Sequence, residues 1–254
     1  MKPGTGTGAE QYDSIGARFE ESKSTAAFSA ADTFTLRGAL GEVTGLAALD
    51  LACGYGYNTR LLAARGARPV VGVDVSVEMI RLAEKNEAGS PMGIDYVVAD
   101  VADLPSLRRF DLATAIYLFN YAPTRAALDS MFRGIRANLA DHGRLLAIVA
   151  NPTPFPEANY DEFGLRILER VPGREVPLIR QEFTTDPPTP LEDYEWQLAD
   201  YEGAARRAGF DTVQWSPIRT PPPDRERDEA FWRRYRRHPV SSLMTCVVHG
   251  DPDR

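Results

Sequence analysis

The chain has 254 residues, 43% of them hydrophobic, and a formal net charge of −7. That length allows one large α/β domain with elaborations, and the acidic balance argues against a nucleic-acid partner, because neutralising phosphates needs a basic surface. No apolar run approaches the ~20 residues of a membrane span, and the first residues lack the apolar core of a signal peptide. We therefore expect a cytoplasmic protein, monomeric or homodimeric, without a membrane partner.

The cysteines and histidines predict neither disulfides nor a metal site. Cys53 and Cys246 both lie in apolar runs, which predicts buried free thiols in a reducing compartment. The three histidines are scattered along the chain, and this spacing does not favour a set of metal ligands.

Residues 1–44 precede the first expected strand and predict two helices. Tyr12, Ile15 and Phe19 fall on one face of a helix over 12–23, and a second helix is expected over 29–40. Tyr12 and Phe19 are either packing residues or part of a binding surface, and the pattern leaves both open.

The stretch 49–62, LDLACGYGYNTRLL, predicts a strand, a glycine turn and a helix. We place the strand near 46–51 and the helix near 57–65. Gly54 and Gly56 allow backbone angles and a close ligand approach that a Cβ would block. This arrangement presents backbone N–H groups and a helix N-terminus to a ligand lying over the strand ends.

Two later apolar runs end in aspartates. A strand over 69–74 ends in Asp74, and a strand over 94–99 is followed by Asp100. In a parallel sheet both carboxylates lie at the edge where such sheets bind ligands. A purely structural reading, in which both aspartates only cap helices, is the alternative.

A nicotinamide or flavin site is the competing ligand hypothesis. Its fingerprint needs a third glycine, and this chain has Thr59 there. Asp100 also has no role in a dinucleotide site, so the pattern favours another ligand.

These residues resemble the class I, Rossmann-like S-adenosylmethionine-dependent methyltransferases over roughly residues 45–149. The run DLACGYG matches the family's first motif, with Ala52 where a glycine is more usual. The resemblance implies that Asp74 holds the ribose hydroxyls and that Asp100 lies near the adenine amino group. S-adenosylmethionine would be the cofactor and S-adenosylhomocysteine its product. The residues that the resemblance assigns to cofactor binding are Tyr12, Asp50, Ala52, Gly54, Gly56, Asn58, Asp74, Val75, Met79, Asp100, Val101 and Tyr117.

The resemblance also implies a fold class and a division of the chain. We expect an α/β fold with a seven-stranded mixed sheet, its last strand antiparallel, and helices on both faces. Residues 1–44 would form a lid of N-terminal helices over the cofactor, and residues 45–254 the main domain. Substrate-cap insertions are expected near 152–193 and 219–239.

The second half of the chain continues this pattern and then departs from it. A strand from Phe110 to about Tyr117, a helix and a strand over 144–151 are expected, with His142 in the turn before the last of these. Residues 152–190 hold eight of the nineteen prolines, so they cannot form one regular element. We expect a substrate cap there, with a plain surface loop as the alternative. A helix over 191–208 with Gly209 as its C-cap, a strand over 210–218 and a last strand over 241–250 complete the prediction.

The acceptor site is expected beside the end of the fourth strand and under the cap. Tyr117, Asn120 and Tyr121 follow that strand and are the catalytic candidates. His238 is a candidate base, although an exposed histidine at a helix end explains it equally simply. The chain lacks the Asn-Pro-Pro-Tyr run that resembling enzymes acting on planar nitrogens often carry. The predicted substrate-binding residues are the cap aromatics Phe155, Tyr160, Phe163 and Phe183.

The sequence therefore predicts transfer of a methyl group to a small, apolar or aromatic molecule. The chain resembles bacterial secondary-metabolite methyltransferases, including the toxoflavin-type N-methyltransferases. The alternative is a non-methylating enzyme of the same fold, a cyclase or pericyclase that binds the same cofactor. A protein-interaction module does not explain why both aspartates fall at strand ends.

Overall fold

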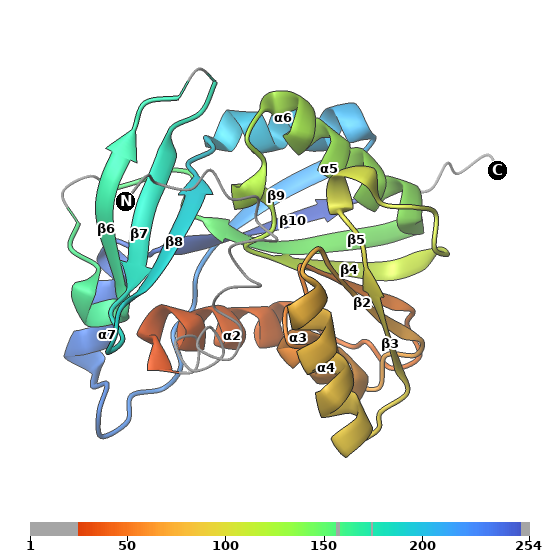
Figure 1. Ribbon diagram of the computed structural model, residues 1–254, viewed down its shortest axis with the longest axis horizontal. Coiled ribbons are helices and arrows are strands. Elements are labelled where there is room, and N and C mark those ends of the chain that lie inside the picture. The colour runs from red at the N-terminus through yellow and green to blue at the C-terminus, as the bar shows by residue number, and fades with distance from the viewer. Residues whose placement is uncertain (1–24, 156–157, 174, 250–254) are drawn as a thin grey trace.

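The computed structural model describes residues 25–155, 158–173 and 175–249 (Figure 1). A seven-stranded sheet with the order β3-β2-β1-β4-β5-β10-β9 forms its centre. The first five strands are parallel, and β10 pairs antiparallel with both β5 and β9. This confirms the predicted fold class. The strands are β1 (Ala48–Leu51), β2 (Val70–Asp74), β3 (Ile94–Val98), β4 (Phe110–Ile116), β5 (Leu139–Ala150), β9 (Thr212–Pro217) and β10 (Ser241–Val247).

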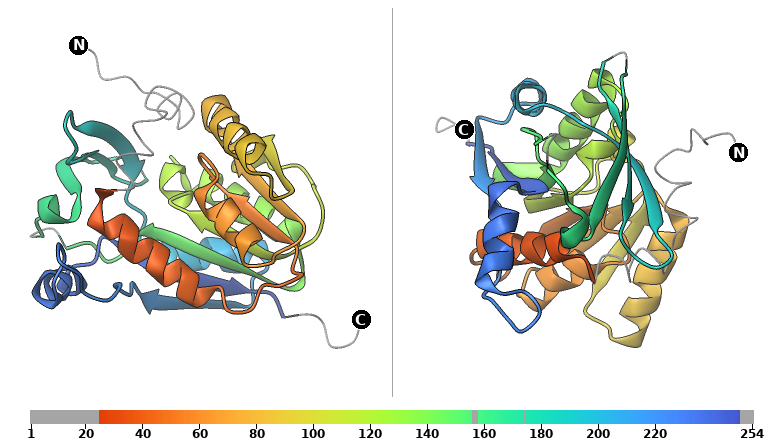
Figure 2. Two further views of the ribbon diagram at one scale, coloured as in Figure 1. Left: turned by 90° about the horizontal axis from the view of Figure 1, so that it is seen from below. Right: turned by 90° about the vertical axis from the view of Figure 1, so that its left-hand side faces the viewer.

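Helices cover both faces of this sheet, as Figures 1 and 2 show. Alternation along β5 explains why both faces are apolar: Leu146 and Ile148 enter one core cluster, and Leu145 and Ala147 enter the other. On the first face lie α2 (Ala27–Ala39), α3 (Tyr57–Ala64) and α4 (Val77–Gly89), and on the second lie α5 (Arg125–Asn138) and α6 (Leu198–Ala208).

Helix α2 belongs to the core of the molecule. Phe28, Ala31 and Leu36 are buried in the cluster that also contains Ile148 of β5. The second predicted N-terminal helix is thus present, and it covers part of the first face of the sheet. That the N-terminal helices form a lid over the cofactor stays a prediction. The first predicted helix, with Tyr12, lies outside the described residues.

A second, smaller sheet follows β5 and forms the cap. It is antiparallel with the order β6-β7-β8 and appears in green and teal at the left of Figure 1. Its strands are β6 (Leu165–Val171), β7 (Leu178–Phe183) and β8 (Thr189–Tyr194). The predicted insertion after the fifth strand is therefore present, and it is a folded sheet.

The predicted helix over 191–208 begins too early. Residues 191–194 pair with β7 as part of β8, and their alternating burial has the period of a strand. The helix α6 begins only at Leu198, after a capping box between Gln197 and Asp200. It ends at Gly209, whose φ of 94° supports the predicted C-cap.

The second insertion contains α7 (Glu229–Arg237), which packs against the base of the cap. The Asp228 side chain caps its N-terminus by accepting from the backbone N–H of Phe231 at 2.7 Å. Trp232 and Tyr235 are fully buried, whereas Arg234 forms a salt bridge with Glu162. The helix therefore buries an aromatic face and exposes Arg233, Arg234, Arg236 and Arg237.

The structure also shows where His142 and the two cysteines lie. His142 is exposed and has a φ of 67°, within an irregular part of β5, which suits the turn residue expected there. Cys53 and Cys246 are both buried and free. None of the described helices is long and apolar enough to cross a membrane.

Candidate functional site

A cavity of about 1090 Å³ lies between the carboxyl ends of the parallel strands and the cap sheet. Its walls come from the glycine turn after β1, the ends of β2 and β4, helix α2 and the inner face of the cap sheet. Single-ligand sites usually measure roughly 300–1,000 Å³. The cavity is therefore just above the upper end of that range, and its lining runs from the glycine turn to the inner face of the cap sheet.

The glycine turn is shaped by left-handed backbone angles. Ala52, Gly54 and Gly56 have φ values of 52°, 56° and 89°. A Cβ added to Gly56 would collide with the Tyr96 hydroxyl, whereas one added to Gly54 would meet no atom within 4 Å. Gly54 thus leaves open space at the cavity wall, which is where the backbone of this motif receives a ligand. Ala52 adopts an angle that favours glycine, which explains why glycine is more usual there.

Asp74 ties this turn to the end of β2. Its Oδ2 accepts from the Gly54 N–H at 2.8 Å, and its Oδ1 accepts from the Ser76 N–H at 2.9 Å. The carboxylate lines the cavity, and an ionised carboxylate can accept several hydrogen bonds at once. Asp74 does not cap α4, because Ser76 accepts from the Met79 N–H in that role.

The residues predicted to lie near the adenine also line the cavity. Asp100 lines the cavity and accepts from the Ala102 N–H at 2.8 Å, which caps the short 3₁₀ helix η1 (Val101–Asp103). Capping therefore explains part of its placement. Further predicted cofactor residues that line the cavity are Ala52, Asn58, Val75, Met79 and Val101.

Asp50 lies beneath the turn and does not line the cavity. It is 1% exposed, and its two oxygens accept from the hydroxyls of Thr59 and Thr114, each at 2.7 Å. The predicted direct contact with the cofactor is therefore corrected to support of the turn from below. Thr59, which replaces the third glycine of a dinucleotide fingerprint, joins α3 to β1 through this bond.

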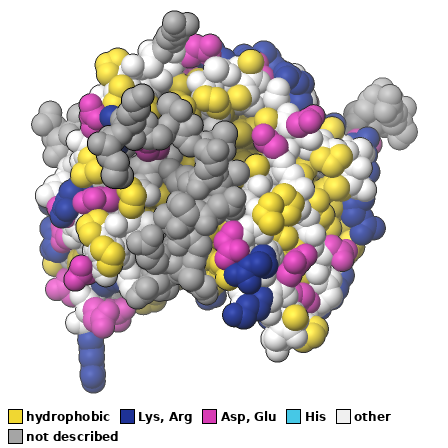
Figure 3. Space-filling view, viewed as in Figure 1, with side chains coloured by type: hydrophobic (Ala, Val, Ile, Leu, Met, Phe, Trp, Pro, Cys, Tyr) yellow, Lys and Arg dark blue, Asp and Glu magenta, His cyan; other side chains and the backbone are white. Residues whose placement is uncertain are grey.

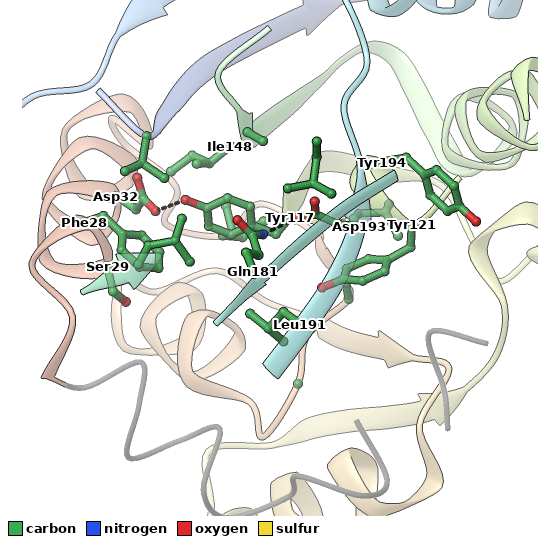
Figure 4. A pocket seen from close by; sticks show the side chains of 18 of the residues that line it. Phe28, Ser29, Asp32, Tyr117, Tyr121, Ile148, Gln181, Leu191, Asp193 and Tyr194 are labelled. Carbon is green, nitrogen blue, oxygen red and sulfur yellow. Dashed lines mark hydrogen bonds between the residues drawn. The ribbon is translucent and has the colours of Figure 1, made fainter. Parts of the chain in front are cut away.

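Tyr117 lies at the end of β4 and lines the cavity with a φ of 57°. Its hydroxyl donates to Asp32 Oδ2 of α2 at 2.7 Å (Figure 4). Ser241 Oγ donates to Asp32 Oδ1 at 2.5 Å. Burial, reinforced by the Asp32 carboxylate, raises the pKa of Tyr117 well above its ordinary value. Tyr117 therefore stays protonated and acts as a hydrogen-bonding group and not as a base.

Sequence reasoning missed Asp32, although a signal was present. Asp32 follows Phe28 by four residues and precedes Leu36 by four, so all three lie on one helical face. An acidic residue in the middle of an apolar face needs a partner, and here that partner is the Tyr117 hydroxyl.

The other two catalytic candidates from the same loop differ in position. Both belong to the 3₁₀ helix η2 (Phe119–Tyr121). Tyr121 lines the cavity, whereas Asn120 is fully buried behind the wall and lies next to the Asp193 carboxyl of β8. The predicted contact of Asn120 with the acceptor is therefore corrected to support of β8.

The four cap aromatics divide into two pairs. Tyr160 and Phe183 line the cavity, and Phe183 stacks on Phe28 of α2 with centroids 5.8 Å apart. Phe163 packs edge-to-face on Phe231 and Tyr235, behind the cavity wall.

The remaining predicted residues, Phe155 and His238, meet each other outside the cavity. Their ring centroids are 4.7 Å apart, and neither residue lines the cavity. Phe163 packs on α7, and Phe155 packs on His238 at the C-terminal end of that helix, so these three predicted residues do not line the cavity.

The cap sheet adds a polar pair that the sequence analysis did not identify. Gln181 Nε2 of β7 donates to Asp193 Oδ2 of β8 at 2.8 Å (Figure 4). Burial raises the pKa of Asp193 to about 7, while the neighbouring Asn120 and Gln181 side chains oppose that rise. Only the pairing of β7 with β8 shows which side of the strand faces the cavity.

The central part of the chain matches a known protein family. Residues 48–143 match the family described as "Methyltransferase domain". The chain is 29% identical over 115 residues to a ubiquinone biosynthesis O-methyltransferase of Xanthomonas euvesicatoria, covering 44% of this chain and 46% of that protein. The match thus spans about half the length of that relative.

Two further similarities extend over more of the chain. It is 27% identical over 186 residues to the N-demethylindolmycin N-methyltransferase of Streptomyces griseus, covering 69% of this chain and 74% of that protein. The solved structure of the CcbJ methyltransferase from Streptomyces caelestis aligns with a TM-score of 0.69 at 18% identity, covering 94% of this chain and 98% of that one. The structural likeness shows that the fold, including the region of the cap, is shared.

Proposed function

We propose that this protein, which carries a class I S-adenosylmethionine-dependent methyltransferase domain, transfers a methyl group to a small, largely apolar or aromatic molecule. The observation that supports this most is the single cavity that joins the glycine turn to the inner face of the cap sheet. A cofactor beside the turn and an acceptor under the cap would meet at Tyr117, where the two parts of the wall join.

The residues around the turn fit the cofactor. The space beside Gly54 would accept its amino-acid portion, and the Asp74 carboxylate, which lines the cavity, would accept from its ribose hydroxyls. Met79 and Asp100 supply an apolar and a polar contact for the adenine. When bound, S-adenosylmethionine supplies an electrophilic methyl group on a sulfonium, so the chain has to orient the acceptor and exclude water.

The cap side of the cavity is suited to an organic molecule of modest size. Tyr160, Phe183 and Leu191 give it apolar walls, and Tyr121 adds a hydroxyl at its edge. On the described part of the face in Figure 3, Lys and Arg side chains are interspersed with acidic ones and form no stripe. This supports a small-molecule acceptor over a polyanion.

We assign the protein to bacterial secondary metabolism, supported by its similarity to the Streptomyces griseus N-methyltransferase. Membership of the toxoflavin-type subgroup, the cytoplasmic location and the monomeric or homodimeric state remain proposals of the same kind.

Calorimetry and a transfer assay together test the proposed function. We expect saturable binding of S-adenosylhomocysteine and no comparable binding of NAD. With methyl-labelled S-adenosylmethionine, label should appear in an added acceptor as S-adenosylhomocysteine is released. Saturable NAD binding without a response to S-adenosylhomocysteine would refute the proposal. Cofactor binding with a chemical change in the acceptor but no label transfer would favour the cyclase alternative.

A further inference from the structure

The inner face of the cap sheet carries apolar side chains around a single Asp, Asp193, which lies beside Gln181. Alternation along the strands places Ile179 and Phe183 of β7 and Leu191 of β8 on the same side of the sheet as Asp193. Asp193 is only 7% exposed, yet its side chain lines the cavity. In Figure 4 the Gln181–Asp193 pair lies on the same side of the cavity as Tyr121, with the Tyr117 ring between the pair and Asp32.

No cation of the described chain neutralises this carboxyl group. Its hydrogen-bond partner is the neutral amide of Gln181, the Asn120 side chain lies beside it, and the nearby charge of Glu195 is of the same sign. Of the arginines that line the cavity, Arg170 pairs with Glu195 at 3.2 Å, and Arg37 is exposed on α2. A buried carboxylate without a cationic partner is costly, and a ligand that brings its own positive charge would remove that cost.

We propose that the acceptor is an amine, that Asp193 binds its ammonium group, and that Asp193 takes up the proton that must leave the nitrogen before transfer. This inference rests on the proposed function and adds the class of the acceptor. An acidic acceptor is disfavoured, because it would approach Asp193 and Glu195, and the arginines in the described part of the cap sheet are already paired with acidic residues.

The step balances with these groups alone. A proton moves from the ammonium nitrogen to Asp193 Oδ, which frees the nitrogen lone pair. That pair forms the N–C bond to the methyl carbon, while the electrons of the broken C–S bond stay on sulfur. The product leaves as an N-methylammonium ion, and Asp193 releases its proton to solvent. One proton is therefore liberated for each methyl group transferred.

Matched amines and alcohols test the inference by binding alone. The full chain is saturated with S-adenosylhomocysteine and titrated with phenethylamine, tryptamine and N-methylbenzylamine, and with the alcohol in which a hydroxyl replaces each amino group. We expect at least one amine to bind about tenfold or more tightly than its alcohol, because of a charge-assisted bond to Asp193. Asp193→Asn should abolish that preference, whereas Asp95→Asn, which removes an exposed carboxylate from β3, should keep it.

The proton balance gives a second readout that a purely structural role would not change. Near pH 6 Asp193 is mostly protonated, so binding an ammonium should release about one proton, measurable as buffer-dependent binding heat. The groups facing Asp193 are Gln181 of β7, Asn120 of η2 and Tyr201 of α6, together with the Glu195–Arg170 pair. Asp193→Asn should release none.

The outcomes separate this inference from the proposed function. If no amine binds more tightly than its alcohol, or if Asp193→Asn keeps the preference and the proton release, the inference is wrong. If the wild-type protein does not bind S-adenosylhomocysteine, the proposed function itself fails. A variant that still binds S-adenosylhomocysteine with wild-type affinity is folded, and its amine titrations decide the question.

Discussion

The cofactor side of the cavity and the cap side differ in how far apart in sequence their contacts lie. Asp74 meets Gly54 across 20 residues, and Asp100 caps a turn two residues away. On the acceptor side Asp32 meets Tyr117 across 85 residues and Ser241 across 209. The first side is a local motif repeated along neighbouring strands, and the second exists only once distant segments have packed together.

The carboxyl groups of Asp74 and Asp193 also differ in the groups that contact them. Backbone N–H groups hold the carboxylate of Asp74, which favours its charged form. Asp193 has neutral amides in an apolar wall, and burial dominates its pKa. The cofactor side is therefore organised before any ligand binds, whereas the cap side retains a charge requirement that a ligand can meet.

The largest expected effect is a loss of stability at Phe163, which packs behind the cavity wall, in contrast to Phe183, which lines the cavity. Phe163→Ala should lower the free energy of unfolding by about 3–5 kcal/mol, because it leaves a cavity among Phe231 and Tyr235. Urea denaturation measures this loss. Phe183→Ala is the matched variant: it should weaken binding of the phenethylamine probe, while S-adenosylhomocysteine affinity holds. If Phe163→Ala impairs probe binding with unchanged stability, Phe163 belongs to the wall.

Asp74→Ala should weaken binding on the cofactor side of the cavity. We expect a loss of about 3 kcal/mol in S-adenosylhomocysteine binding, because charge-assisted bonds are lost. A smaller loss of stability should accompany it, since the N–H groups of Gly54 and Ser76 lose their acceptor. Calorimetry and urea denaturation are run in parallel, with Asp95→Ala as the control. Unchanged affinity together with a large loss of stability would make Asp74 a purely structural residue.

Asp193→Asn should change how the free energy of unfolding depends on pH. The pKa of Asp193 in the folded protein, about 7, lies above its ordinary value of 3.8. The folded state therefore binds the proton more tightly, and this group lowers the stability of the wild type as the pH rises from about 4 to 7. The asparagine variant avoids this loss and should be more stable by up to about 4 kcal/mol near pH 8, with little gain near pH 4.

Urea denaturation at both pH values checks that sign. A variant less stable than the wild type near pH 8 would mean that the hydrogen bond from Gln181 outweighs the cost of burying the charge. If Asp193→Asn is more stable but no longer binds amines, then Asp193 lowers the stability of the protein and is needed for ligand binding.

Ala52→Gly should have the smallest effect. Glycine relieves the left-handed angle at this position but adds freedom to the unfolded chain, and these contributions of about 1 kcal/mol each oppose one another. We expect stability within about 1 kcal/mol of the wild type and unchanged S-adenosylhomocysteine affinity. A marked loss of affinity would show that the Ala52 methyl group contacts the cofactor. Ala52→Val, which forces a β-branched residue into the same angle, should be clearly destabilising.

The sequence alone was sufficient for the central sheet, the glycine turn and the places of Asp74 and Asp100. Each of these depends on short-range patterns: apolar runs of strand length, glycines where the backbone turns left-handed, and acids where parallel strands end. Even the departures within this motif, Ala52 and Thr59, have local consequences that the neighbouring residues explain.

Tertiary structure alone decided the architecture of the cap and the residues under it. The segment 191–194 became a strand because β7 supplied its hydrogen bonds, although an isolated reading favoured a helix. The same pairing turned Asp193 toward the cavity, and the packing of α7 drew Phe163 and His238 away from it. Which face of a strand becomes a binding surface depends on what covers the other face, and that information lies in contacts between distant segments.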